Sequence, residues 1–464
     1  MASKAFELIP SARRMITSLR DMGYDFATAV ADVIDNSIEA KASRIAIDVN
    51  FDGDDSSVRI ADNGHGMTPA QIREALRYGA EREYDSKDAL GKFGLGLKTA
   101  SMSQCQRLTL ASRSSDSRSD IYAQAWDLEH VMATDRWEIV EVAKAQQPEA
   151  LRKPLMEGPG TVVFWQRLDR ILGYKHPYGE MAKKRLSSMC RELEEHLGMV
   201  FHRYMAGEAG GRKIRITLNG NPIKLWDPFS RAEPKTQELE PITLTYDHDA
   251  VTGKVVISPY VLPHQDDYSS QQAHVDAGGP LRWNRQQGFY IYRANRMIQS
   301  GGWSNLRTLD EHTKLARVAV SFSPELDEAF RINVAKMKVQ LPQLLREQFE
   351  KAIGPVIKIA QTAYRRPERT VPGAGPSRTT ARSNLDLAVS SLAKDVRGQV
   401  SSVSGNGAAG VEQNTARSAQ DKLARPRLYS VAELRSAAER VATRKERPVV
   451  TAVFERLNRE LADE

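Results

Sequence analysis

Hydrophobic residues recur at the spacing of one helix face between residues 26 and 39. The members of this set are Phe26, Val30, Val33, Ile34 and Ile38. Their intervals of three and four residues predict a helix with one buried face, and Asp25 can cap its first free amide groups. Asp32, Asn36 and Glu39 fall on the other side. The four-residue spacing of Asp32 and Asn36 lets both side chains reach one ligand.

Alternating apolar and polar residues after this helix predict a sheet. Strands are expected at residues 44–51, 57–61, 107–112, 120–127, 137–142 and 160–166. Thr68 followed by Pro69 predicts the start of a helix that ends near Gly79. Residues 80–90 are charged and lack periodicity, which indicates a loop. Helices against one mixed or antiparallel sheet predict the α/β class, as a two-layer α/β sandwich.

The second half of the chain also contains patterns that predict helices and strands. A helix is expected at residues 181–202, and a strand from residue 213 that runs into an Asn219-Gly220 turn. Further strands are expected at 255–261, 288–292 and 318–321, followed by a long helix at 342–363. Near the end, Ser430 and Glu433 form a capping-box pattern. Val450, Phe454, Leu457 and Leu461 form one apolar helix face, for docking or for packing on the chain's own core.

The positive charge is concentrated in one segment. The net charge is +7, but residues 365–428 hold eleven Lys and Arg against five Asp and Glu. The remainder of the chain is therefore nearly neutral. This segment is rich in Pro, Gly, Ser and Ala, a composition that cannot bury a core, so we expect a disordered basic linker.

The sequence offers little support for metal chemistry based on Cys or His. Cys105 and Cys190 are isolated, and the nine histidines are scattered without metal-ligand spacing. We therefore expect reduced cysteines and no structural zinc. No stretch is apolar enough to cross a membrane, and residues 1–20 lack the apolar centre of a signal peptide. These features predict a cytoplasmic protein without membrane contact.

Two glycine-bearing stretches complete the pattern begun by Asp32 and Asn36. They are DNGHGM at residues 62–67 and GKFGLGLK at residues 91–98. The three motifs, in this order and spacing, resemble the GHKL ATPases, which include gyrase, ninety-kilodalton heat-shock chaperones, sensor histidine kinases, MutL and MORC proteins. The sequences of these motifs look most like those of MORC-type ATPases and the bacterial relatives of that group. The second glycine stretch fits neither a Walker A loop nor a Rossmann turn.

The resemblance implies a fold and a domain order. It implies a GHKL or Bergerat ATP-binding domain over residues 1–170 and connecting helices over 171–206. A transducer-like α+β domain, built on a right-handed β-α-β unit, is expected over 207–364. The disordered basic linker then covers 365–428, and C-terminal helices cover 429–464.

The resemblance also assigns ligand-binding roles. Asp62 would accept the adenine amino group, and Gly64 and Gly66 would let the backbone approach the base. Met67 belongs to the same nucleotide-binding motif. Asn36 would coordinate Mg²⁺, which takes few protein ligands and relies on phosphate oxygens. The residues expected around the phosphates are Gly91, Lys92, Phe93, Gly94, Leu95, Gly96 and Lys98. For Lys92 and Lys98 a solvated position is the alternative.

Two residues are candidates for catalysis. Asp32 occupies the position that is usually a glutamate in the family, where it would act as general base. Because aspartate is one methylene shorter, we expect slow hydrolysis. Relatives contribute a lysine from the transducer domain to the γ-phosphate. Lys336 fits this role best, with Lys338 as the other candidate and a surface position as the alternative.

These residues predict a Mg²⁺-dependent ATPase that forms ADP and phosphate. ATP would order the 80–90 loop and drive homodimerisation, so that the protein acts as a clamp or switch on DNA or a partner enzyme. Duplex DNA would bind through residues 365–428. A chaperone or interaction scaffold without DNA binding is the alternative. A sensor histidine kinase would need a phosphoacceptor histidine before the ATP domain. The first histidine, His65, lies inside the DNGHGM motif, so we do not expect a protein of this class.

Overall fold

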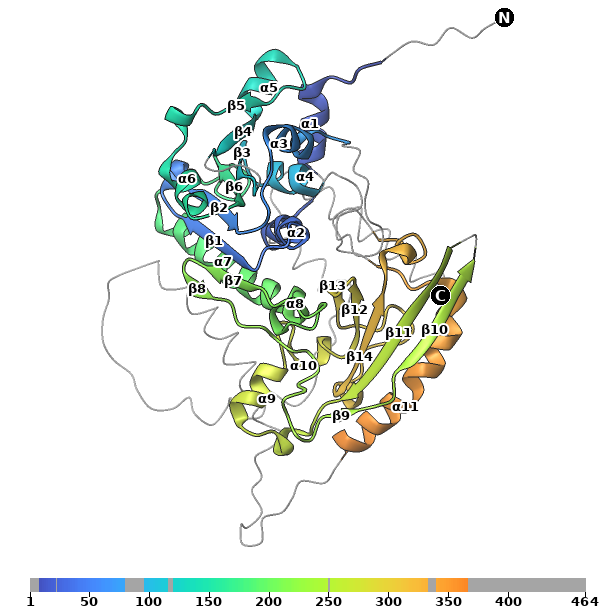
Figure 1. The fold of residues 1–464 in the computed structure, drawn as a ribbon. Helices are drawn as coiled ribbons and strands as arrows, with labels where there is room; N and C mark the ends of the chain where they lie inside the picture. Colours follow the sequence, from blue (N-terminus) through green and yellow to red (C-terminus); the bar gives the residue numbers. More distant parts are fainter. Residues whose placement is uncertain are drawn as a thin grey trace, which may run out of the picture. The chain divides into compact units, whose positions relative to one another are not determined.

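The computed structural model describes residues 8–21, 23–79, 96–115, 120–248, 251–332 and 339–365. Internal contacts divide the chain after residue 368, and all of the described residues belong to the first unit. Figure 1 shows the fold of this part. The predicted basic linker and C-terminal helices lie outside the described residues, apart from Arg365. Their structure and the predicted domain boundaries stay predictions.

An eight-stranded sheet organises the first part of the chain, with strand order β5-β4-β3-β6-β2-β1-β7-β8 (Figure 1). Its neighbouring strands are antiparallel except for β1 and β7, which are parallel. The mixed α/β class expected from the sequence is confirmed. The strands are β1 (Arg44–Asn50), β2 (Ser57–Asp62), β3 (Arg107–Arg113), β4 (Tyr122–Asp127), β5 (Val140–Glu141), β6 (Gly160–Gln166), β7 (Arg215–Leu218) and β8 (Asn221–Pro222).

One face of this sheet carries the main helical layer and the largest core. Its helices are α1 (Ala12–Arg20), α2 (Phe26–Glu39), α3 (Pro69–Leu76), α4 (Gly96–Met102), α7 (Glu180–Val200) and α8 (His202–Ala206). Helix α2 is buried on nearly all sides because α4, α7 and β2 pack around it. Asp25 caps it as predicted, with its carboxylate accepting from the Thr28 amide at 2.8 Å. The Thr68 cap of α3 is also confirmed, as a capping box with Gln71.

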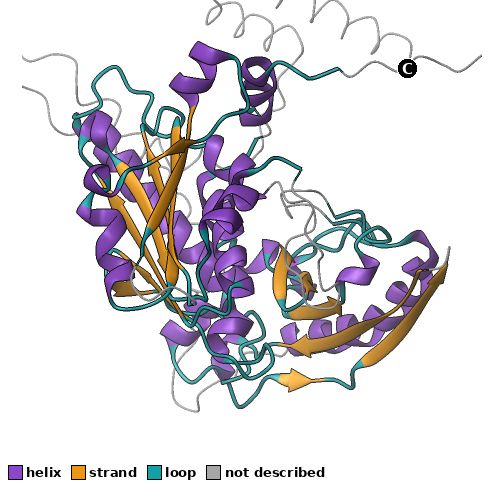
Figure 2. Cartoon of the chain, turned by 45° about the horizontal axis from the view of Figure 1, so that its top comes forward, coloured by secondary structure: helices purple, strands orange, loops and turns teal. Residues whose placement is uncertain are grey.

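A short helix covers the other face of the sheet, which the sequence did not reveal. This helix, α6 (Glu149–Met156), packs on small residues of the strands, among them Ala61, Ala111 and Ala125. Figure 2 shows helices on both sides of the sheet. Strands β3 and β6 are consequently buried on both faces. A further helix that the sequence analysis missed, α5 (Leu128–Thr134), follows β4.

Strands β7 and β8 belong to the first sheet, although they follow α7 and α8 in the chain. Strand β7 pairs with β1, in a register that places Arg215 beside Arg44. Ile216 is fully buried in the same core as Leu193 and Leu197 of α7. Hydrophobic burial therefore recruits this strand to the first sheet.

A second sheet follows, with strand order β10-β11-β14-β12-β13 and β9 beside β11. Its strands are β9 (Gln237–Glu238), β10 (Ile242–His248), β11 (Val251–Val261), β12 (Gly288–Arg293), β13 (Arg296–Ser300) and β14 (Ala316–Phe322). Strands β12 and β14 are parallel, and the residues joining them form β13 and a 3₁₀ turn (Glu311–Thr313). The long helix expected at residues 342–363 is confirmed as α11 (Arg346–Tyr364), which packs on this sheet through Phe349 and Val356 among others. Helices α9 (Gln271–Ala277) and α10 (Arg282–Arg285) precede β12.

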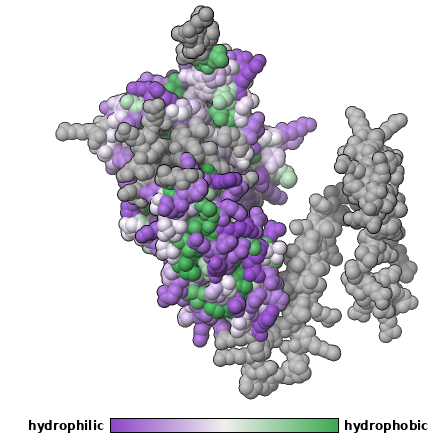
Figure 3. Space-filling view, turned by 90° about the vertical axis from the view of Figure 1, so that its right-hand side faces the viewer, coloured by the Kyte–Doolittle hydropathy of each residue, from purple (hydrophilic) through white to green (hydrophobic). Residues whose placement is uncertain are grey.

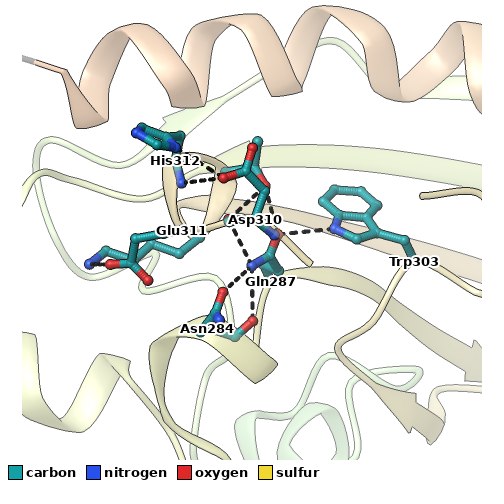
Figure 4. A network of polar contacts seen from close by, with 8 residues as sticks. Asn284, Gln287, Trp303, Asp310, Glu311 and His312 are labelled. Carbon is teal, nitrogen blue, oxygen red and sulfur yellow. Dashed lines mark hydrogen bonds and ion pairs between the residues drawn. The ribbon is translucent and has the colours of Figure 1, made fainter. Parts of the chain in front are cut away.

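The buried side-chain amide of Gln287 forms hydrogen bonds with the segment between β13 and β14. The Gln287 side chain is fully buried, and its oxygen accepts hydrogen bonds from Trp303 Nε1 and the Thr313 hydroxyl (Figure 4). Its nitrogen donates to the carbonyl oxygens of Asn284 and Asp310. Because a buried amide without partners is costly, this network specifies one arrangement of the segment.

Strands β10 and β11 of the second sheet expose apolar residues. In Figure 3 hydrophobic residues gather in the lower half of the face, at the height where Figure 1 places β10, β11 and α11. Ile242 of β10 and Val256 of β11 are each 36 % exposed. Among the described residues, no helix combines the length and the apolar character needed to cross a membrane.

Candidate functional site

Asp62 ends β2 at the rim of a cavity. One carboxylate oxygen accepts from the Gly64 amide at 2.8 Å, and the other accepts from the Ser37 hydroxyl at 2.9 Å. Burial raises the pKa of Asp62, while the hydrogen bonds from Gly64, Ser37 and the backbone of Thr161 oppose that shift. The strand, the following turn and α2 thus converge on one acceptor group.

The turn after Asp62 needs its glycines for packing within the protein. Gly66 has a φ of +68°, and a Cβ there would lie 1.9 Å from the Arg113 carbonyl oxygen. A Cβ at Gly64 would lie 2.7 Å from the Ala40 carbonyl oxygen. Side chains at either position would therefore collide with backbone. The resemblance explained these glycines by approach to a base, and the structure supplies an additional reason that holds without any ligand.

The cavity beside Asp62 has a volume of about 370 Å³. Most of its wall is apolar, and Asp62, Asn36 and Thr161 place polar groups in it. A mainly apolar cavity with a few convergent polar groups is typical of small-molecule sites. The lining residues are Val33, Asn36, Ser37, Glu39, Ala40, Asp62, His65, Gly66, Met67, Gln71, Glu74, Ala75, Leu97, Leu110, Thr161 and Val163.

Asn36 lies in the cavity wall with its amide group anchored. Its Nδ2 donates to the Asp32 carbonyl oxygen at 2.8 Å, which leaves Oδ1 as the atom able to coordinate a cation. Among the described residues, no group of three or more His, Cys, Asp and Glu side chains is arranged to hold a metal. A single amide oxygen nevertheless fits Mg²⁺, since this ion takes most of its ligands from water and phosphates.

Asp32 lies on the same helix, but its carboxylate is not part of the cavity lining. The side chain is 1 % exposed. Oδ2 accepts from the Tyr24 hydroxyl at 2.9 Å, and Oδ1 lies 3.6 Å from Arg296 Nη2. A Cβ added at Gly96, the first residue of α4, would lie 3.5 Å from Oδ2. The predicted base therefore sits beside the start of α4, where the sequence analysis expects phosphates.

Lys98 is buried rather than solvated. It is 2 % exposed, and its Nζ donates to the Ala75 carbonyl oxygen at 3.1 Å. The Tyr78 ring centre is 5.8 Å from Nζ. The solvated position considered for this lysine is wrong, and its assignment to the phosphates stays a prediction.

Several predicted site residues lie outside the described residues. They are Gly91, Lys92, Phe93, Gly94, Leu95 and the two alternative lysines Lys336 and Lys338. The loop expected at residues 80–90 is outside them too. Of the predicted set, the structure brings Asp62, Gly66, Met67 and Asn36 together at one cavity, and the Gly64 amide donates to Asp62. Gly96 and Asp32 lie close to each other beyond the cavity.

Sequence reasoning missed four residues of this region. Ser37 and Thr161 hold Asp62, whereas Tyr24 and Arg296 hold Asp32. Ser37 could have been found because it follows Asn36 on α2. The others had no local signal, since their contacts form only when distant segments fold together.

Comparison with known proteins identifies this part of the chain. Residues 24–157 match the family described as histidine kinase-, DNA gyrase B- and HSP90-like ATPases. The DNA mismatch repair protein MutL of Mannheimia succiniciproducens is 36 % identical over 109 residues, which is 22 % of this chain and 17 % of that protein. MutL of Shewanella amazonensis is 35 % identical over 104 residues, 22 % of this chain and 15 % of its own length. The matched stretch thus spans less than a fifth of either relative.

Proposed function

Because residues 24–157 form an ATP-binding domain of the GHKL ATPase family, we propose that this chain binds ATP beside Asp62 and hydrolyses it slowly. The observation that carries the proposal is the Asp62 carboxylate, held by Ser37 and Gly64 at the rim of an otherwise mainly apolar cavity. An adenine ring suits such a cavity because it is apolar on its faces and carries an amino donor at one edge.

The proposed roles combine the described geometry with the family resemblance. Asp62 accepts the adenine amino group, and Asn36 offers its amide oxygen to Mg²⁺, which would neutralise phosphate charge when bound. We assign the phosphates to Gly96 and to the glycines that precede it in the sequence, with positive charge from Lys98. Asp32 takes the proton of the attacking water. Lys336 remains our choice for the residue that contacts the γ-phosphate from the second half of the chain.

Slow turnover follows from the position of Asp32. Aspartate reaches one methylene less far than the family's usual glutamate, and its carboxylate is already engaged by Tyr24 and Arg296. A displacement of about 1 Å can cost about a hundredfold in rate. A slow ATPase suits a protein that uses the nucleotide to change conformation rather than to supply a product.

We propose a homodimeric clamp or switch as the cellular role. MutL proteins are named for DNA mismatch repair, and the basic segment 365–428 offers charge for duplex DNA or for an acidic partner enzyme. MORC-type relatives remain the subgroup that the motif spelling favours. A chaperone or scaffold role is the other outcome, which DNA-binding measurements with and without a nonhydrolysable ATP analogue would separate.

The test of the nucleotide site is Asp62→Asn measured by calorimetry with ATP. The variant turns a donor toward the adenine amino group, so ATP affinity should fall at least about tenfold. Asp127→Asn is a matched control, because Asp127 also ends a strand but binds Arg107 and Arg167 outside the cavity. Undiminished affinity in folded Asp62→Asn would refute the assignment of this cavity.

A further inference from the structure

Arg296 connects the second sheet to the helix that carries the proposed base. It begins β13, directly after the two-residue turn of Ala294 and Asn295, whose φ angles are 45° and 67°. Its side chain is 3 % exposed, so the guanidinium is almost completely removed from water. The Tyr204 hydroxyl of α8 donates to the Ala294 carbonyl oxygen at 2.7 Å, which fixes the hairpin tip.

The guanidinium lies between two carboxylates of α2. Arg296 Nε is 2.8 Å from Asp35 Oδ2, and Nη2 is 3.6 Å from Asp32 Oδ1. Asp32 and Asp35 are three residues apart and share this side of the helix. Nearby His196 of α7 adds no positive charge at neutral pH, because burial and the charge of Arg296 lower its pKa to about 4.

Asp32 is therefore oriented from two directions. The Tyr24 hydroxyl donates to Oδ2, and burial together with the Asp32 charge raises the pKa of Tyr24 far above its usual value, which keeps this donor protonated. Arg296 faces Oδ1 from the second sheet. The closer contact with Asp35 anchors the guanidinium, so its position does not depend on Asp32 alone.

We propose that Arg296 is a positioning residue for ATP hydrolysis. It orients the Asp32 carboxylate and balances its buried charge, so that turnover requires the β12–β13 hairpin to be docked on α2. This inference rests on the proposed function, in which Asp32 is the base. Arg296 does not line the cavity beside Asp62, so nucleotide affinity should not depend on it.

The same hairpin contains a matched control. Arg293 pairs directly with Arg296 across the turn, and it is also 3 % exposed. Its Nε and Nη2 lie 2.6 and 2.8 Å from the two carboxylate oxygens of Asp327. This ion pair lies within the second sheet and its following turn. Arg293 therefore serves as the control for the loss of a buried arginine from this hairpin.

The experiment compares Arg296→Met, Arg296→Lys and Arg293→Met with the unaltered full-length protein. Steady-state phosphate release gives kcat and KM, calorimetry gives affinity for a nonhydrolysable ATP analogue, and thermal melting reports folding. We expect Arg296→Met to lower kcat at least about tenfold, since misplaced catalytic groups cost up to about a hundredfold. Analogue affinity should stay within about threefold. Arg296→Lys should recover part of the rate, because charge is kept and the two-pronged geometry is lost.

The outcomes are distinguishable. Arg293→Met should melt earlier but keep kcat within about twofold per folded molecule, because it does not touch Asp32. Unchanged or raised kcat in Arg296→Met, or an equal loss in Arg293→Met, would overturn the positioning role. If Arg296→Met does not fold, Arg296→Lys decides the question by the same comparison of kcat with affinity. Failure of the unaltered protein to bind or hydrolyse ATP would instead refute the proposed function.

Discussion

Removing the Asp32 carboxylate should abolish turnover while leaving ATP binding intact. Asp32 does not line the cavity beside Asp62, so substitutions of Asp32 do not change the surface proposed to receive adenine. Loss of a general base typically costs about 10²–10⁴-fold in rate. We therefore expect Asp32→Asn and Asp32→Ala to lower kcat by about that factor, with affinity for a nonhydrolysable analogue within about threefold.

The cost in stability follows from the contacts of Asp32. In Asp32→Ala the buried Tyr24 hydroxyl loses its acceptor, a loss of about 1–3 kcal/mol. Removing one partner of a buried ion pair costs about 3–5 kcal/mol, but Arg296 keeps its closer contact with Asp35 and the loss should be smaller. A total of about 2–4 kcal/mol is a large part of a typical stability of about 5–15 kcal/mol. Asp32→Asn keeps an acceptor for Tyr24 and should be the milder variant.

Three measurements check this prediction: phosphate release, calorimetry with the analogue, and chemical denaturation. Asp327→Asn is the control, because Asp327 is also a buried partner of an arginine and is 3 % exposed. It should lose stability but keep its turnover. Asp32→Glu should keep or raise the rate by restoring the family's usual reach, at a packing cost of about 1–3 kcal/mol. Undiminished turnover in folded Asp32→Asn would place the base elsewhere.

Three further expectations concern pH, assembly and DNA. Because burial raises the pKa of Asp62, the native state holds this proton to higher pH than the unfolded state. The unfolding free energy relative to Asp62→Asn should therefore fall as pH rises above about 4; denaturation titrations that find it constant or rising would contradict this. A nonhydrolysable ATP analogue should drive dimerisation in sedimentation velocity, and a monomer at saturating analogue and high protein concentration would be the contrary result. Truncation after Tyr364 should weaken duplex DNA binding and flatten its salt dependence, because residues 365–428 hold six of the seven net charges. Equal affinity and slope in the truncated protein would locate DNA binding on the remaining part of the chain.

The sequence predicted features that depend on neighbouring residues. The Asp25 cap, the helix start at Thr68-Pro69 and the position of Asp62 at the end of β2 are all decided within a few residues, so their patterns could be interpreted directly. Helix α6 was not predicted because it depends on residues far away in the sequence. It carries Pro154 in its interior, which disfavours a helix locally, and it forms because Leu151 and Leu155 pack on the second face of the sheet.

Long-range charge pairing could not be predicted. Arg293 and Arg296 flank the same turn, and nothing in their local sequence distinguishes one from the other. Only the folded chain brings Arg296 to Asp35, across 261 residues, while Arg293 meets Asp327 nearby. The sequence therefore indicated where a nucleotide would bind but not what holds the proposed base.

The two ends of the proposed site differ in the segments on which they depend. Asp62, Ser37 and Thr161 belong to the first sheet and its helix α2, so the adenine end can form without the second sheet. The Asp32 end needs Arg296 from β13 and, on the proposed function, Lys336 from the segment after β14. Binding and hydrolysis should therefore respond separately to changes in how the second sheet docks. Such a separation would let a partner of the second sheet control turnover without displacing the nucleotide.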